Sequence, residues 1–205
     1  MNKPKKNVGV EQVNLQDIVV PIKGITSLLT NRITEAAGES VERNLERLPK
    51  LPSNQGDGDT DNLWLEKCHL CDPSVAETEG RYGMPAAAFR NAMIAVGRNK
   101  GASGGINMAS ARQMFQVMGD IIPIRCRVFR RRVDPAVTQQ KKLIATVRPE
   151  FIDWEADIPI RYNADVISAA QVVNLVQQAG FAPGVGSWRP ECKGNHGMFE
   201  VRAEK

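Results

Sequence analysis

The sequence predicts an α+β fold whose elements follow the order strand, helix, strand, strand, helix, strand. Residues 154–162 alternate between apolar and polar side chains, as a strand with one buried face does. Residues 82–97 and the residues that follow Ser168 carry the apolar spacing and the start signals of helices. The resulting βαββαβ order is typical of the ferredoxin-like arrangement, here with a large insertion after the first strand.

The first strand is predicted over residues 15–25, which are rich in β-branched side chains. Pro21 lacks a backbone N–H, which indicates an edge strand or a bulge. Thr34 has the position of a helix N-cap, and residues 49–62 contain prolines, glycines and aspartates but almost no apolar side chains. Residues 49–62 are therefore expected to form a surface loop.

The chain has 205 residues, of which 42% are hydrophobic and 24% are charged, the usual balance of a globular domain. We expect a flexible basic tail over residues 1–12 and a single ferredoxin-like domain over residues 13–205. Within that domain, residues 34–79 are expected to be an insertion that projects from the core.

In the middle of the chain, residues 82–97 are predicted to form a helix because alanines dominate and Pro85 fits the first turn. Residues 115–133 are predicted to form a strand pair or one long bent strand, since apolar side chains alternate with arginines from residue 122 to 128. A short strand is expected over residues 143–147.

The last predicted helix begins at Ser168, which together with Gln171 has the spacing of a capping box. Gly180 has the place of the glycine that ends a helix. A glycine-rich loop follows and leads into a final strand over residues 198–203.

The charge of the chain is distributed unevenly. Residues 89–148 contain twelve lysines and arginines but only two aspartates, whereas the other residues contain fifteen basic and twenty-one acidic side chains. A basic block in an otherwise acidic chain indicates a polyanion partner. The alternative is that this block pairs with counterions or with the protein's own acidic residues.

The glycine-rich loop carries Trp188, Arg189 and Lys193 between its glycines. An aromatic ring beside two cations suits an unstacked base and a phosphate backbone. The alternative interpretation is a hairpin whose Trp188 fills the core.

Four residues have the spacing of zinc ligands, namely Cys68, Cys71, Cys192 and His196. The two halves of this set lie about 120 residues apart, and the alternative, which we prefer, is ordinary free cysteines with a surface histidine. No nucleophile motif or phosphate-binding lysine motif is present. We therefore expect no metal, no cofactor and no catalytic residue.

No apolar run approaches the length of a membrane helix, and no secretory signal precedes the four cysteines. We expect a protein without membrane contact in a reducing compartment, the cytoplasm, which for a phage-encoded protein is that of the host cell.

Residues 24–32, 82–93, 184–191 and 197–201 together resemble, over nearly the whole chain, a protein family that is frequent in bacteriophage genomes. More distantly, in the order of these motifs, the chain resembles RAMP-type proteins, which form the backbone of CRISPR effector complexes. The resemblance implies a ferredoxin-like core that binds nucleic acid.

We therefore expect a non-enzymatic protein that binds single-stranded RNA or DNA along its backbone, as a homo-oligomer or filament. The alternative is a phage virion or assembly protein whose basic face contacts a neighbouring subunit. The expected nucleic-acid-binding residues are Arg90, Arg98, Lys100, Arg125, Arg127, Arg130, Arg131, Arg132, Trp188, Arg189 and Lys193.

Overall fold

The computed structural model describes residues 12–33, 64–98, 101, 103–137 and 143–202, together with the single positions 38, 42 and 45. The strands of these residues form one antiparallel sheet in the order β3-β4-β6-β7-β1-β8, with β2 and β5 also paired to β7. In chain order, the strands are β1 (Leu15–Gly24), β2 (Leu28–Leu29), β3 (His69–Leu70), β4 (Glu79–Pro85), β5 (Phe115–Val117), β6 (Ile121–Val137), β7 (Leu143–Asn163) and β8 (Phe199–Val201).

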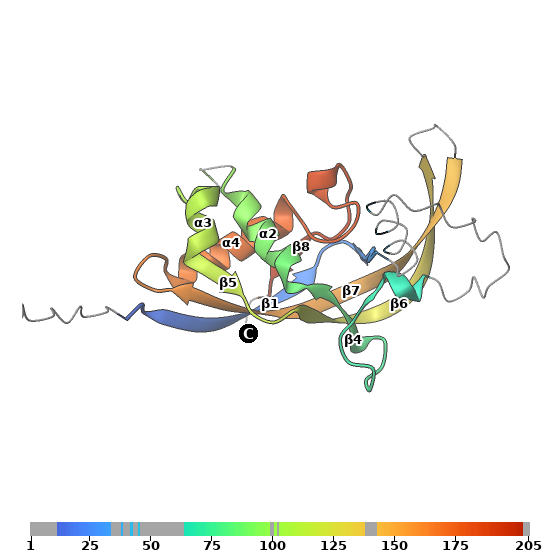
Figure 1. Cartoon of the computed structure of the whole chain (residues 1–205), viewed down its shortest axis with the longest axis horizontal. Coiled ribbons are helices and arrows are strands. Elements are labelled where there is room, and N and C mark those ends of the chain that lie inside the picture. The colour runs from blue at the N-terminus through green and yellow to red at the C-terminus, as the bar shows by residue number, and fades with distance from the viewer. Residues whose placement is uncertain are drawn as a thin grey trace, which may run out of the picture.

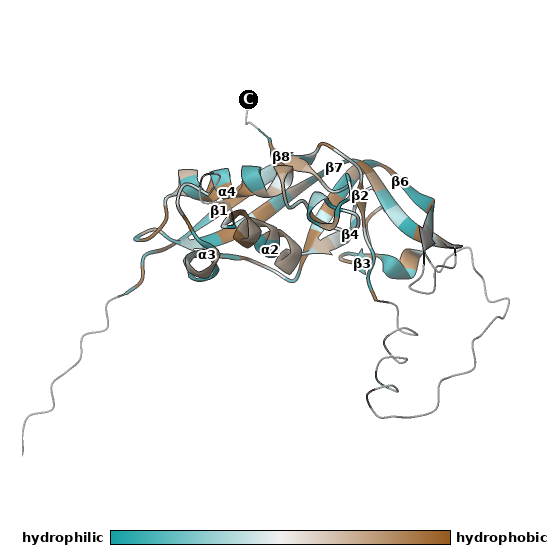
Figure 2. Ribbon diagram, turned by 90° about the horizontal axis from the view of Figure 1, so that it is seen from above, coloured by the Kyte–Doolittle hydropathy of each residue, from teal (hydrophilic) through white to brown (hydrophobic). Residues whose placement is uncertain are grey.

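The three described α-helices lie on one face of this sheet (Figure 1). They are α2 (Ala86–Val96), α3 (Met108–Met114) and α4 (Ala169–Phe181), and two short 3-10 helices accompany them, η1 (Leu65–Lys67) and η2 (Pro190–Cys192). Seen from above, α2 and α4 run close to each other over the middle of the sheet (Figure 2). The α+β class predicted from the sequence is therefore confirmed. No described helix is long and apolar enough to cross a membrane.

The alternating residues of β7 build the centre of the core. Trp154, Ala156 and Ile158 have no exposed surface, and the polar residues between them face away from the helices. Trp154 donates its indole N–H to the carbonyl of Thr26 at 2.8 Å. Gly24 leaves room for this ring, since a Cβ at that position would lie 2.1 Å from the indole nitrogen.

The capping box at the start of α4 is present as predicted, with Ser168 and Gln171 bonded reciprocally. The helix continues past Gly180 to Phe181, however, so this glycine belongs to its last turn and does not end it. A Cβ on Gly180 would lie 2.0 Å from the carbonyl oxygen of Phe199. This glycine is therefore needed for the close approach of α4 to β8.

The helix predicted over residues 82–97 begins only at Ala86, because the residues before it form β4 and pair with β6. Gly83 permits this pairing at close range, since a Cβ there would lie 2.4 Å from the carbonyl oxygen of Ile122. The glycine and proline of this segment are the residues that keep it out of the helix.

The two shorter strands predicted over residues 143–147 and 154–162 are one continuous strand, β7, which pairs with β6 in a long hairpin. In Figure 1 this hairpin extends beyond the helices at one end of the sheet. The ring of Phe129 packs there against Trp64, Tyr82 and Phe151, with centroids 4.9–5.2 Å apart.

The predicted insertion over residues 34–79 is described mainly from residue 64 onward. There β3 joins the edge of the main sheet, and Cys68 is buried in the core. The rest of this segment, with the N-cap assigned to Thr34, lies outside the described residues apart from three single positions. The tail predicted over residues 1–12 also lies outside them except for residue 12.

Candidate nucleic-acid interface

Most arginines of the β6–β7 hairpin form ion pairs with carboxylates of the same hairpin. Arg125 pairs with Asp157 at 2.9 Å, and Arg127 pairs with Asp153 at 2.6 Å. Arg131 is exposed and has no ion-pair partner among the described residues. The charge of the hairpin arginines is therefore largely compensated by acidic neighbours.

Glu150 is the centre of the most buried of these ion pairs, with only 2% of its surface exposed. Its carboxylate accepts hydrogen bonds from Arg130 at 2.7 Å, from Arg132 at 2.8 Å and from Ser27 at 2.9 Å. Burial acts to raise the pKa of Glu150, but the hydrogen bonds from the two arginines and Ser27 outweigh it, and the pKa is lowered. Arg132 is also bound to Asp134 at 2.9 Å.

A second group of arginines surrounds a hollow of about 390 Å³ between α2, α3 and the glycine-rich loop. One carboxylate, Glu191, faces them from the loop. The other lining side chains are neutral, so the hollow has a marked excess of positive charge. Its lining residues are Arg90, Asn91, Ile94, Ala95, Arg98, Met108, Arg112, Arg189 and Glu191.

Glu191 compensates only part of that charge. Its two oxygens bind Arg98 at 2.6 Å and Arg189 at 2.9 Å. Burial acts to raise the pKa of Glu191, but the hydrogen bonds from Arg189 and Arg98 outweigh it, so the pKa is lowered and the group stays ionised. Two guanidinium groups therefore share a single carboxylate.

The other two arginines of the hollow have no carboxylate within ion-pair distance in the part of the chain that the structure describes. Arg90 donates one hydrogen bond to the backbone carbonyl of Arg112 at 2.8 Å. The Nε of Arg90 is buried and has no hydrogen-bond partner. Arg112 lies on α3, which Asn107 caps by accepting a hydrogen bond from the backbone N–H of Ser110. These two guanidinium groups carry uncompensated charge.

A polar hollow of about 340 Å³ adjoins this one, because Asn91 and Arg189 line both. It lies between α2, the segment after β2 and the glycine-rich loop. We call the two hollows together the α2 groove. The adjoining hollow is lined by Asn31, His69, Met84, Ala88, Asn91, Gly184, Val185, Gly186, Ser187 and Arg189.

The glycine-rich loop that forms one wall of the groove is fixed by backbone hydrogen bonds to the segment around β2. Ser187 donates its N–H to Leu29 at 2.8 Å, and Gly197 donates its N–H to Ser27 at 2.9 Å. Gly186 has a φ of +80°, and a Cβ on it would lie 2.4 Å from the carbonyl oxygen of Leu29. The loop therefore holds Arg189 on a firmly positioned backbone.

Trp188 lies beside the groove on the same loop and does not belong to the buried core. Its backbone φ is +53°, and the guanidinium carbon of Arg148 lies 4.5 Å from its ring centroid. The Nε and Nη1 of Arg148 are buried without a hydrogen-bond partner.

The structure therefore divides the expected nucleic-acid-binding residues into two groups. Arg90, Arg98 and Arg189 come together in the α2 groove, although they come from distant parts of the sequence. Lys193 is exposed after η2, near Trp188 in the chain, and Lys100 lies outside the described residues. The five hairpin arginines lie on the sheet, away from the groove lining.

Sequence reasoning did not assign Asn91, Arg112 or Arg148 to the site. Asn91 directly follows Arg90 on α2, and adjacent side chains of a helix point in different directions, so helical spacing gave no signal for Asn91. The position of Arg112 depends on how α3 packs against α2, which no local pattern encodes.

No group of three or more histidines, cysteines or acidic residues within the described ranges is placed to hold a metal ion. Cys68 is buried, and burial raises the pKa of its thiol to about 12. Cys192 is exposed on η2, and His196 is bonded to Ser27 at 3.0 Å. The four residues with zinc-ligand spacing therefore do not form a cluster.

No family model and no curated protein matches this chain. Among solved structures, the chain is similar to the crystal structure of Cmr6 from Pyrococcus furiosus, with a TM-score of 0.41 and 9% sequence identity. The alignment covers 93% of this chain and 100% of that chain. A similarity at this TM-score carries no argument about function, which rests on the α2 groove instead.

Proposed function

We propose that this chain is a non-enzymatic nucleic-acid-binding protein, of bacteriophage or mobile-element origin, that holds single-stranded RNA or DNA in the α2 groove. The observation that carries the proposal is the ratio of four arginines to one carboxylate around the hollow. A guanidinium group can bind a phosphate through two parallel hydrogen bonds. Phosphate contacts supply most of the affinity for a single strand.

The side chains beside these arginines suit the same ligand. Asn91, Asn31 and the backbone of the glycine-rich loop add neutral hydrogen-bonding groups next to the cations. Backbone and amide groups of this kind contact phosphate and sugar without reading sequence. Binding along the backbone with little sequence preference follows from this arrangement.

The core that supports the groove is proposed to be ferredoxin-like and RAMP-like. The strand order β8-β1-β7-β6 supports this, since α2 connects β1 to β6 through intervening segments and α4 connects β7 to β8. In this arrangement the helices that carry the groove lie on one face and leave the opposite face of the sheet open.

A second candidate function is that of a phage virion or assembly protein, and the open face of the sheet favours it. Val19 and Met118 are 61% and 37% exposed there, and they line a shallow apolar hollow of about 300 Å³ with Pro159. An assembly subunit would bury this patch against a neighbour. Purified protein with a protein-like 260/280 absorbance ratio and a Val19-dependent oligomer would favour this candidate.

Binding to short homopolymers tests the nucleic-acid proposal. We would measure fluorescence anisotropy of labelled oligodeoxythymidylate and oligouridylate of about 12 nucleotides, a length that a single-strand-binding domain covers. Salt would be varied from about 50 to 200 mM. The groove variant is Arg90→Ala with Arg112→Ala, and the matched control, which removes the same charge, is Arg125→Ala with Arg127→Ala.

The groove variant is expected to flatten the slope of log K against log salt by about 1.4, that is roughly 0.7 for each lost phosphate contact. The control variant is expected to keep the wild-type slope. Equal losses in the two variants would show that the groove has no special role, and an absence of wild-type binding to both strands would contradict the proposal itself.

A further inference from the structure

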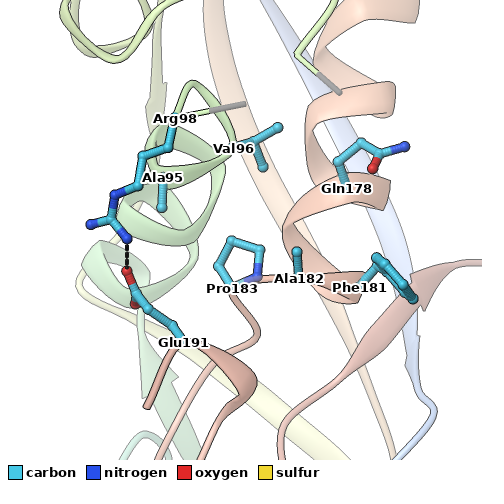
Figure 3. Close-up of a pocket in the computed structure, with 8 residues that line it drawn as sticks. All are labelled: Ala95, Val96, Arg98, Gln178, Phe181, Ala182, Pro183 and Glu191. Atoms are coloured by element: carbon cyan, nitrogen blue, oxygen red, sulfur yellow. Dashed lines mark hydrogen bonds and ion pairs between the residues drawn. The ribbon is translucent and has the colours of Figure 1, made fainter. Parts of the chain in front are cut away.

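An apolar hollow of about 320 Å³ lies at one end of the α2 groove, between the last turns of α2 and α4 (Figure 3). The ion pair of Arg98 and Glu191 stands at one side of it and Phe181 at the other, with Pro183 and Ala182 between them. Its lining residues are Ala95, Val96, Arg98, Gln178, Phe181, Ala182, Pro183 and Glu191. We call it the α4-end hollow.

This hollow is continuous with the arginine-lined part of the groove, because Ala95, Arg98 and Glu191 line both. The change in character between the two is abrupt. Arginines surround the first hollow, whereas the α4-end hollow has small aliphatic side chains, a proline ring and an aromatic ring. A ligand that spans both must combine an anionic part with a flat or apolar part.

Phe181 is the aromatic side chain available at this position, and it is 66% exposed. Phe181 is the last residue of α4 and does not pack into the core, so its ring faces solvent. Gln178, one turn earlier on α4, lines the same hollow, and its side-chain amide makes no hydrogen bond within the described residues. An amide offers both a donor and an acceptor.

We propose that the α4-end hollow is the subsite for an unstacked base of the bound strand. Phe181 is the stacking platform, and Gln178 donates to or accepts from the edge of the base. The inference rests on the proposed function, since the strand is brought to the hollow by its phosphates in the arginine-lined part of the groove. Because a phenyl ring stacks on any base and an amide serves either polarity, this subsite selects single strands over duplexes without selecting a sequence.

The test separates the base from the backbone. One probe is a labelled oligodeoxythymidylate of about 12 nucleotides, and the other is a deoxyribose-phosphate strand of the same length without bases, which keeps every phosphate. Anisotropy titrations would use the full chain and three variants. These are Phe181→Ala, Arg112→Ala, and Val166→Ala as a control that trims an apolar side chain that is 53% exposed and belongs to none of the hollows described above.

Phe181→Ala is expected to weaken binding of the thymidylate strand roughly 5- to 150-fold and to leave binding of the base-free strand unchanged. Arg112→Ala is expected to weaken binding of both strands, and Val166→Ala is expected to weaken neither. A melting curve of each variant checks that it folds. Because Phe181 is exposed, Phe181→Ala should change the melting temperature very little.

Two further outcomes would overturn the inference alone. In the first, Phe181→Ala binds the thymidylate strand with unchanged affinity while Arg112→Ala binds both strands more weakly. In the second, Phe181→Ala loses the same affinity for the thymidylate strand and for the base-free strand. Failure of the wild-type protein to bind either strand would instead overturn the proposed function and the subsite with it.

Discussion

The arginines of the β6–β7 hairpin and those of the α2 groove are alike in chemistry and opposite in surroundings. On the hairpin, Arg125 and Arg130 each have a carboxylate within 2.9 Å. In the groove, Glu191 pairs only with Arg98 and Arg189, and Arg90 and Arg112 have no carboxylate partner among the described residues. The hairpin arginines, which are the denser run in the sequence, are therefore less available to bind a phosphate than the groove arginines.

The reason lies in the pairing of the strands. In an antiparallel ladder, each side chain faces one directly opposite and two diagonally, and opposite charges in those places attract. Arg130 lies opposite Glu150, and Arg125 is diagonal to Asp157. The groove arginines come instead from a helix, a second helix and a loop, where no register supplies acidic partners. The comparison shows that positive potential depends on which elements meet rather than on charge density along the chain.

The largest effect on stability is expected at the centre of the hairpin pairs. Glu150→Gln removes the charge that Arg130 and Arg132 bind but keeps the size of the side chain. Hydrogen bonds to a buried charged group contribute about 1.5–3 kcal/mol, so the free energy of unfolding should fall by that amount. Urea denaturation measures it, and Arg112→Ala, which breaks no ion pair, serves as the control. If Arg112→Ala lowered the free energy of unfolding as much as Glu150→Gln, the proposed difference between the hairpin and the groove would be contradicted.

Trp188 lies between the regions, since it is on the groove loop and Arg148 of β7 stacks on it. Trp188→Ala is expected to reduce the affinity for a single strand by roughly 1–3 kcal/mol if bases stack on its free surface. Its effect on unfolding should be smaller, about 1 kcal/mol, because the ring contacts Arg148 and His196 but lies outside the buried core. Anisotropy and thermal melting of the same variant measure the two effects. A stability loss of about 3–5 kcal/mol would assign Trp188 to the core after all.

The effect of the hairpin variant Glu150→Gln on the free energy of unfolding should depend on pH, whereas the effect of the groove variants should not. The pKa of Glu150 is lowered in the folded protein from an ordinary value of 4.5, so the unfolded chain takes up the proton first as the pH falls. The stability that Glu150 contributes is therefore complete above that ordinary value and is lost as the pH falls through the folded pKa. The difference in unfolding free energy between wild type and Glu150→Gln should shrink on acidification. A difference that stays constant from about pH 6 to pH 3 would contradict this.

The smallest effect is expected from freeing one hairpin arginine. Asp153→Asn removes the partner of Arg127, an exposed pair of the kind that contributes about 0–1 kcal/mol. Asparagine also tolerates the left-handed backbone at this position, where φ is +50°. Stability and strand binding should both stay near wild type. A clear gain in affinity would show that the strand also passes over the hairpin and that the ion pairs had masked it.

Much of the fold was predictable because its signals are local. The alternation over residues 154–162 gave the buried face of β7, and Ser168 with Gln171 gave the start of α4. The start of α2 was misplaced because Gly83 and Pro85 looked compatible with a first turn. Gly83 instead lets β4 pair closely with β6, a contact between segments about 40 residues apart, and Pro85 is the last residue of β4.

The candidate site was predictable only in part. Arg90, Arg98 and Arg189 were named from the charge of their neighbourhoods, and the structure brings them together. The compensation of the hairpin arginines was not foreseen as the dominant effect, because the acidic partners lie up to 32 residues further along the chain. The position of Arg112 depends on how the helices pack, and that of Phe181 depends on where α4 ends. No local sequence pattern predicts either.

The contact of Ser27 with Glu150 and His196 has a consequence for the proton on the imidazole ring. A hydroxyl group has a single hydrogen, and the ionised carboxylate of Glu150 can only accept, so Ser27 donates to Glu150. The Oγ of Ser27 must then accept from the Nδ1 of His196, 3.0 Å away. The neutral ring is therefore the Nδ1–H tautomer, with a lone pair on Nε2. Beside Trp188, the loop thus offers a hydrogen-bond acceptor at the Nε2 of the neutral ring.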